Sequence, residues 1–158
     1  MPIRTFIKEI SSALPQSGKI LALDIGTVWT GVAISDSLGL LARPFTTILA
    51  HTLHQYLAQL FTQETIHTVI VGYPRTMSGT ESDQTRLVVG EFDKLKIIFP
   101  DKQWLLWDER LSSKRAAQLG SRRTKEARLH EQARAAAFIL DLYLTHQLAR
   151  RNGTFNSD

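Results

Sequence analysis

The stretch from Ile20 to Asp36 constrains the fold more than any other part of the chain. An apolar run ends in an acid at Asp24, a short Gly/Thr turn follows, and a second apolar run begins at Gly31. Two such runs joined by a short turn predict an antiparallel hairpin, with Asp24 at the tip of a buried strand. Because Gly26 has no Cβ, a phosphate or a metal ion can approach the backbone closely beside this acid. A plain turn-capping role for Asp24 is the alternative.

A D-x-G-T turn recurs in two large classes of protein, the polynucleotide-cutting folds of the RNase H type and the actin-like or sugar-kinase ATPases. At 158 residues the chain has room for one domain with a sizeable core. An actin-like ATPase closes two such domains around its nucleotide, so a single RNase H-type domain fits better. The chain has no cysteine, no apolar run near 18 residues and no signal-peptide pattern in residues 1–19. We therefore expect a cytoplasmic protein with no membrane span.

The basic residues are concentrated in one segment. Residues 110–134 hold eight lysines and arginines against two glutamates, so this segment carries +6 and the rest of the chain −2. This charge predicts a face that binds a polyanion through salt-sensitive phosphate contacts, with a solvated helix surface as the alternative. The candidate nucleic-acid ligands are Thr27, Arg75, Arg110, Lys114, Arg122, Arg123 and Lys125.

The patterning predicts an α/β fold with a mixed five-stranded sheet flanked by helices. Strands are expected at 20–24, 31–36, 41–49, 67–72 and 103–107, and helices at 53–61, 83–96, 112–120 and 131–149. The third strand is expected to bend or begin at Pro44, and Asp83 to cap the helix that it opens. An N-terminal helical extension is predicted for residues 1–19, one domain for 20–149 and a flexible tail for 150–158.

Several acids follow predicted strands. If the later strands run parallel to the first, Asp24, Gly72 and Glu109 meet at the carboxyl edge of the sheet, where open α/β sheets bind ligands. Asp36 ends the antiparallel second strand and falls at the opposite edge, so we exclude it from the site. Asp108 adjoins Glu109 but points to the other face of the sheet, because side chains alternate along a strand.

Seven short motifs occur in order along the chain. They are residues 22–27 (ALDIGT), 31–36 (GVAISD), 42–44 (ARP), 70–74 (IVGYP), 77–81 (MSGTE), 108–112 (DERLS) and 136–144 (AAFILDLYL). Together they resemble the YqgF family of bacterial proteins, also called RuvX or RuvC-like resolvases, over about Leu21 to Leu144. The resemblance implies an RNase H-like fold and a nuclease that uses Mg²⁺ or Mn²⁺. The implied role is maturation of the 5′ end of the 16S rRNA precursor or, on older analogy, Holliday-junction resolution.

The resemblance also implies a site. Asp24 and Glu109 match two of the family's catalytic and metal-binding acids. The last helix of the family usually carries an aspartate three residues before an Ala-Ala pair, and alignment on Ala135–Ala136 places Gln132 there. A neutral amide oxygen is a poorer Mg²⁺ ligand than a carboxylate. Glu131, about 100° round the helix, is the alternative metal ligand.

Two further functions stay open. One is a catalytically weakened nucleic-acid-binding protein with the same fold, and the other, more distant, is a nucleotide-binding ATPase half-domain. The oligomeric state, the number of metal ions and the choice between RNA and DNA do not follow from the sequence.

Overall fold

Five strands form one mixed sheet in the computed structural model, which describes residues 18–73, 82–108 and 125–153. In sheet order they are β3 (Ala42–Leu49), β2 (Trp29–Ser35), β1 (Lys19–Ile25), β4 (Ile66–Tyr73) and β5 (Gln103–Asp108). β2 is antiparallel to both β1 and β3, whereas β4 is parallel to β1 and β5 is parallel to β4. The predicted hairpin is confirmed, and the carboxyl ends of β1, β4 and β5 lie at one edge of the sheet.

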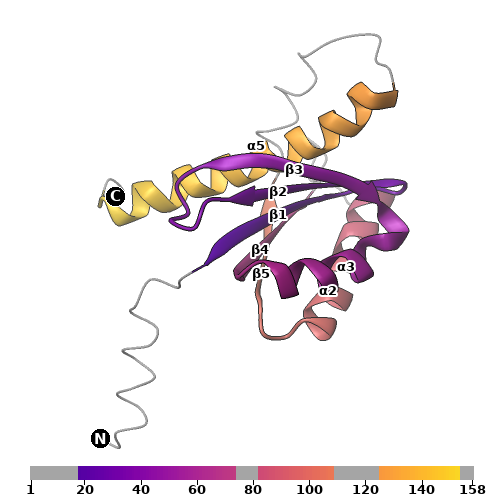
Figure 1. The fold of residues 1–158 in the computed structure, drawn as a ribbon, viewed down its shortest axis with the longest axis horizontal. Coiled ribbons are helices and arrows are strands. Elements are labelled where there is room, and N and C mark those ends of the chain that lie inside the picture. Colours follow the sequence, from indigo (N-terminus) through magenta and orange to yellow (C-terminus); the bar gives the residue numbers. More distant parts are fainter. Residues whose placement is uncertain (1–17, 74–81, 109–124, 154–158) are drawn as a thin grey trace, which may run out of the picture.

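Helices cover both faces of this sheet (Figure 1). The short η1 (Ala50–Thr52) leads into α2 (Leu53–Gln63), and α2 packs on one face together with α3 (Asp83–Ile98). The long α5 (Lys125–Arg151) packs on the other face. Within the three described ranges, no helix combines the length and the apolar character that a bilayer crossing needs.

Alternation along β1 decides which core each side chain joins. The odd-numbered residues from Leu21 to Ile25 pack with α2 and α3, whereas Ile20 and Ala22 pack with α5. Neighbouring side chains of a strand point to opposite faces of the sheet. Asp24 therefore faces α5.

The predicted bend at Pro44 is a β-bulge. The β2–β3 register shifts so that Val32 is paired with Thr46 while Ala33 is paired with Pro44, which leaves Phe45 as the extra residue. β3 lies at the edge of the sheet and has a neighbouring strand on one side only. A proline, which has no N–H to donate, is tolerated at a bulge in such an edge strand. The prediction of a bend at this position is confirmed.

The prediction that Asp83 caps the third helix is wrong by one residue. Ser82 is the N-cap of α3, and its side chain accepts a hydrogen bond from the Thr85 backbone N–H at 3.2 Å. A serine at this position satisfies one of the free amides of the first helical turn. Asp83 is instead the first helical residue, where its charge is favourable to the helix dipole.

The predicted boundaries also move at both ends of the domain. Lys19, assigned above to the N-terminal extension, is the first residue of β1, and α5 continues to Arg151 through the start of the predicted tail. α5 also begins at Lys125, six residues before the predicted Glu131. Residues 125–129 (Lys, Glu, Ala, Arg and Leu) all have high helix propensity, which explains the earlier start of α5. The predictions for residues 1–17, 112–120 and 154–158 lie outside the described residues.

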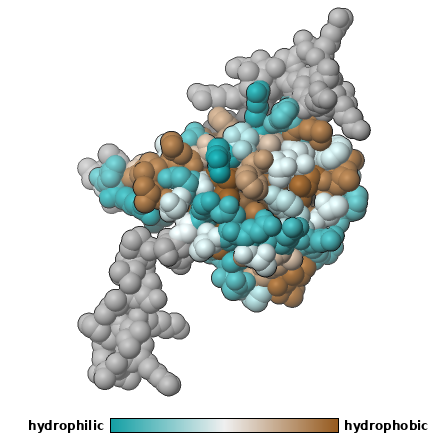
Figure 2. All heavy atoms as spheres, in the orientation of Figure 1, coloured by the Kyte–Doolittle hydropathy of each residue, from teal (hydrophilic) through white to brown (hydrophobic). Residues whose placement is uncertain are grey.

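The exposed apolar side chains of the described ranges are spread over several elements. On the face seen in Figure 2, hydrophobic residues gather in several patches separated by hydrophilic ones. Among the most exposed large apolar side chains of the described ranges are Leu38 and Leu41, each 72% exposed, and Ile97, 80% exposed. The two leucines lie in the β2–β3 connection, at the edge of the sheet away from Asp24, and Ile97 lies near the end of α3.

Candidate functional site

A row of residues crosses the sheet on the α5 face at the level of Asp24. Asp24 is paired with Gly31 of β2, and Gly31 is paired with Thr47 of β3. On the other side, the last pair of the β1–β4 ladder is Leu23 with Val71, and continuing this register by one residue brings Gly72 to the level of Asp24. Gly72 is itself paired with Trp107 of β5. The half-buried Asp24 thus stands between two residues that have no side chain.

α5 crosses this row in direct contact with the sheet. A Cβ at Gly31 would lie 1.9 Å from the Gln132 carbonyl oxygen and 2.3 Å from the Gln132 carbonyl carbon, so only glycine permits this approach. The Thr47 hydroxyl donates a hydrogen bond to the Leu129 carbonyl, about one turn earlier in α5. These two contacts hold α5 over the residue paired with Asp24.

The rotation of α5 about its axis directs Gln132 toward the sheet. Ala136 and Ile139 follow Gln132 at i+4 and i+7 and are buried, so Gln132 lies on the stripe of the helix that packs on the strands. The buried Ala133 lies on one side of Gln132, and Glu131 lies about 100° away on the other side. Of the two alternatives left open by the sequence, Gln132 rather than Glu131 lies on the stripe of α5 that packs on the sheet.

The turn after Asp24 is tight. The Gly26 N–H donates to the Trp29 carbonyl oxygen at 2.9 Å, and a Cβ at Gly26 would lie 2.5 Å from the same oxygen. The turn itself therefore requires glycine, a reason additional to ligand approach. Thr27 and Val28 are exposed at its tip, on the same edge of the sheet as Asp24.

α3 also reaches the tip of β1. The Gln84 side-chain amide donates a hydrogen bond to the Ile25 carbonyl at 2.7 Å, across 59 residues of sequence. The sequence analysis missed Gln84, because no local pattern connects a helical glutamine with a distant strand end.

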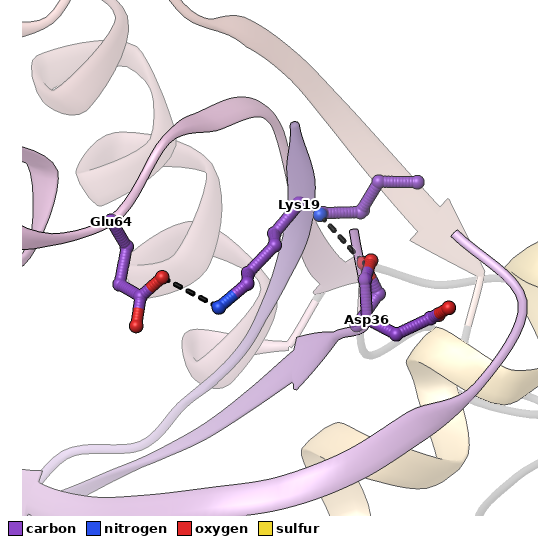
Figure 3. Close-up of polar contacts among 5 residues, drawn as sticks. Lys19, Asp36 and Glu64 are labelled. Carbon is purple, nitrogen blue, oxygen red and sulfur yellow. Dashed lines mark hydrogen bonds and ion pairs between the residues drawn. The ribbon is translucent and has the colours of Figure 1, made fainter. Parts of the chain in front are cut away.

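Asp36 lies at the opposite edge of the sheet, where Figure 3 shows it near the Lys19–Glu64 ion pair of 2.6 Å. Its carboxylate accepts the backbone N–H groups of Leu41 at 2.8 Å and Leu40 at 2.7 Å. The hydrogen bond from Leu41, assisted by that from Leu40, lowers the pKa of Asp36 below its usual value. Asp36 thus organises the β2–β3 connection, and its position agrees with its exclusion from the site.

The last residue of β5, Asp108, does not face α5. Leu105 and Trp107 pack in the core on the α5 side, so alternation turns Asp108 to the α2 and α3 side, as predicted. Most of the remaining predicted ligands lie outside the part of the chain that the structure describes: Arg75, Glu109, Arg110, Lys114, Arg122 and Arg123. Lys125 belongs to α5, but its side chain is not described.

The oxygen donors near Asp24 fit a hard divalent cation. Carboxylate and amide oxygens suit Mg²⁺ and Mn²⁺, and Asp24 and Gln132 present one of each from β1 and α5. Within residues 18–73, 82–108 and 125–153, no three acidic or histidine side chains cluster so as to hold a metal ion. A complete site of carboxylates needs a ligand from outside these ranges, and Glu109 is the predicted one.

Comparison with known proteins connects this arrangement with one family. A family model described as "RuvX: Holliday junction resolvase" matches residues 18–146. A protein of Rubrobacter xylanophilus named "Putative pre-16S rRNA nuclease" is 38% identical over 133 residues, which cover 82% of this chain and 94% of that protein. A protein of the same name from Carboxydothermus hydrogenoformans is 35% identical over 137 residues, which cover 82% and 97% of the two chains.

The solved structure of T. thermophilus RuvC in complex with a Holliday junction substrate is similar in fold. Its TM-score is 0.52 at 11% sequence identity, and the match covers 83% of this chain and 96% of that one. This likeness concerns the fold alone. Together with the observed mixed sheet, it confirms the predicted RNase H-like fold.

Proposed function

Because this chain belongs to the RuvX family, we propose that it is a metal-dependent nuclease that processes the 5′ end of the 16S rRNA precursor. Family membership supports hydrolysis of phosphodiesters, and the names of the relatives support the RNA substrate. The observation that carries the proposal is the position of Asp24. It stands at the carboxyl edge of the parallel strands, on the face covered by α5, between two glycines. Such a reaction would take place in the cytoplasm.

In the proposed site, Asp24 and Glu109 would hold Mg²⁺ or Mn²⁺, and Gln132 would add a neutral oxygen from α5. When bound, the cation neutralises the negative charge that develops on the phosphate. Asp24 needs little reorganisation, because strand pairing and the tight turn fix its backbone. A glutamine in place of a third carboxylate leaves the site with one charge fewer, so we expect the cation to bind more weakly than in a three-carboxylate site.

The basic segment is connected directly to this site. Lys125 begins α5, and Gln132 follows about 10 Å further along the helix axis at 1.5 Å per residue. The part of the basic segment that lies in α5 is therefore on the same helix as Gln132 and within about three turns of it. We assign phosphate binding to the candidates Thr27, Arg75, Arg110, Lys114, Arg122, Arg123 and Lys125.

Two alternatives have specific support. The description of the family model favours a four-way DNA junction as the second candidate substrate. The position of Gln132 favours a protein that binds nucleic acid but cleaves it slowly, because the site then lacks a carboxylate.

Cleavage assays with two substrates test the proposal. The wild-type protein is incubated with a 5′-extended 16S rRNA fragment or a synthetic four-way DNA junction, with Mg²⁺, Mn²⁺ or EDTA. Asp24→Asn keeps the shape of the side chain and removes its charge, so we expect cleavage to fall by at least about 100-fold while RNA binding remains. Asp141→Asn on the exposed side of α5 is the matched control.

Three outcomes would count against the proposal. Cleavage by Asp24→Asn at the wild-type rate would show that Asp24 is not a metal ligand. Cutting of the junction alone would favour the DNA substrate. Metal-independent binding without cleavage of either substrate would favour the binding protein.

A further inference from the structure

The Ile25 carbonyl lies where the β1–β4 ladder ends. The last pair of that ladder is Leu23 with Val71, and Ile25 itself is only 4% exposed. In a parallel ladder, the next bond to the Ile25 carbonyl would come from the N–H of residue 74. That residue is Pro74, which has no N–H to donate.

A buried carbonyl without a donor is costly, and Gln84 supplies the donor. Its side-chain amide bonds the Ile25 oxygen at 2.7 Å, a normal length for an N–H···O bond. Gln84 is the second residue of α3, two residues after the cap made by Ser82. The donor side chain thus belongs to a capped helix rather than to a loop, so its backbone is held in a regular structure.

We propose that Gln84 is a positioning residue for Asp24. The inference rests on the proposed function, because it concerns the carboxylate that holds the cation there. Ile25 is bonded covalently to Asp24, so the orientation of its carbonyl constrains the backbone that carries the Asp24 side chain. On the β2 side the tip of β1 is held by the Gly26–Trp29 bond, and on the β4 side by Gln84.

Loss of the donor would displace this tip. Without Gln84 the Ile25 carbonyl must turn toward water to be hydrated, and the Asp24 carboxylate would move with it. Gln84 therefore acts on the site without contacting the substrate or the cation.

Gln84→Met tests this role, because methionine has a similar length and no N–H donor. The readouts are Mn²⁺ binding by electron paramagnetic resonance, hydrogen exchange of the Gly26 amide, and thermal unfolding. We expect Mn²⁺ to bind about 10-fold more weakly, as is typical when a supporting hydrogen bond behind a ligand is lost. Gly26 should exchange faster, and the melting temperature should fall by only a few degrees.

Gln55→Met on the exposed side of α2 is the matched control and should leave all three readouts unchanged. Gln84→Lys retains a donor of similar reach, so it should restore the protection of the Gly26 amide.

Each failure has a distinct signature. Unchanged Gly26 exchange in Gln84→Met would show that the bond does not hold the tip and would overturn the inference. Faster exchange with unchanged Mn²⁺ affinity would reduce Gln84 to a purely structural role and would also overturn it. A wild-type protein that binds no Mn²⁺ would overturn the proposed function itself, and the inference with it, before any variant is compared.

Discussion

Replacing Gly31 with alanine tests the docking of α5 beside Asp24. The new Cβ would lie 1.9 Å from the Gln132 carbonyl oxygen and 3.0 Å from the Ala133 amide nitrogen. Both are backbone atoms, so no rotation of a side chain relieves the overlap. α5 would have to retreat by at least about 1 Å, or the tips of β1 and β2 would have to bend away.

The movement of α5 should lower both the stability of the fold and the rate of cleavage. Overpacking a filled core costs about 1–3 kcal/mol, and a clash with helix backbone belongs at the upper end, so we expect Gly31→Ala to lose about 3 kcal/mol. For a domain of this size that corresponds to roughly 6–12 °C in Tm. Because Gln132 moves relative to Asp24, cleavage should also fall, by as much as about 100-fold for a 1 Å displacement.

Urea unfolding followed by circular dichroism measures the loss of stability. Gly90→Ala is the matched control, since among the described residues nothing beyond the local backbone of α3 lies within 4 Å of the position of its Cβ in the middle of α3. This control should stabilise the protein by about 0.5–1 kcal/mol, because glycine weakens a helix interior. An unfolding free energy of Gly31→Ala within about 0.5 kcal/mol of the wild type would refute the described contact between α5 and β2.

Three further predictions concern charge and protonation. Binding of RNA should weaken with salt, and removing one basic side chain that binds a phosphate should flatten the plot of log affinity against log salt by about 0.7–0.9. When alanine replaces Arg122, Arg123 and Lys125 together, an unchanged RNA affinity and an unchanged salt slope would show that these residues form a solvated surface that binds no phosphate. Gln132→Asp should tighten Mn²⁺ binding and raise cleavage, because it adds an anionic ligand on the sheet-facing stripe of α5. Glu131→Gln should leave Mn²⁺ binding and cleavage nearly unchanged. At limiting metal, a loss of binding and cleavage in Glu131→Gln with no gain in Gln132→Asp would show that Glu131 is the ligand from α5 instead. Burial raises the pKa of Tyr56 to about 12, and its hydroxyl is buried with no hydrogen-bond partner among the residues that the structure describes. The folded state therefore retains this proton longer than the unfolded chain, so stability should be intact below about pH 10 and fall as the pH rises toward 12. Tyr56→Phe should remove that alkaline loss and be neutral or stabilising at pH 7, and a marked loss of stability at pH 7 would show that the hydroxyl has a partner.

The position of Asp24 at the end of β1 was predictable because the signals that place it are local. Strand alternation, the short turn and the bend at Pro44 each involve residues close together in the sequence. The same local rules placed Asp36 at the opposite edge of the sheet and turned Asp108 to the opposite face. The order of motifs then indicated the family.

The positions of Gln132 and Gln84 were decided only by the tertiary structure. A helical pattern shows which residues share a stripe, but the contact between Gly31 and the Gln132 backbone sets how α5 is rotated and how closely it approaches Asp24. Gln84 meets Ile25 across 59 residues, beyond the last residue pair of the β1–β4 ladder. Such contacts depend on strand order and on the distance between layers. Both are fixed by burial of side chains from the whole chain, so no short stretch of sequence contains them.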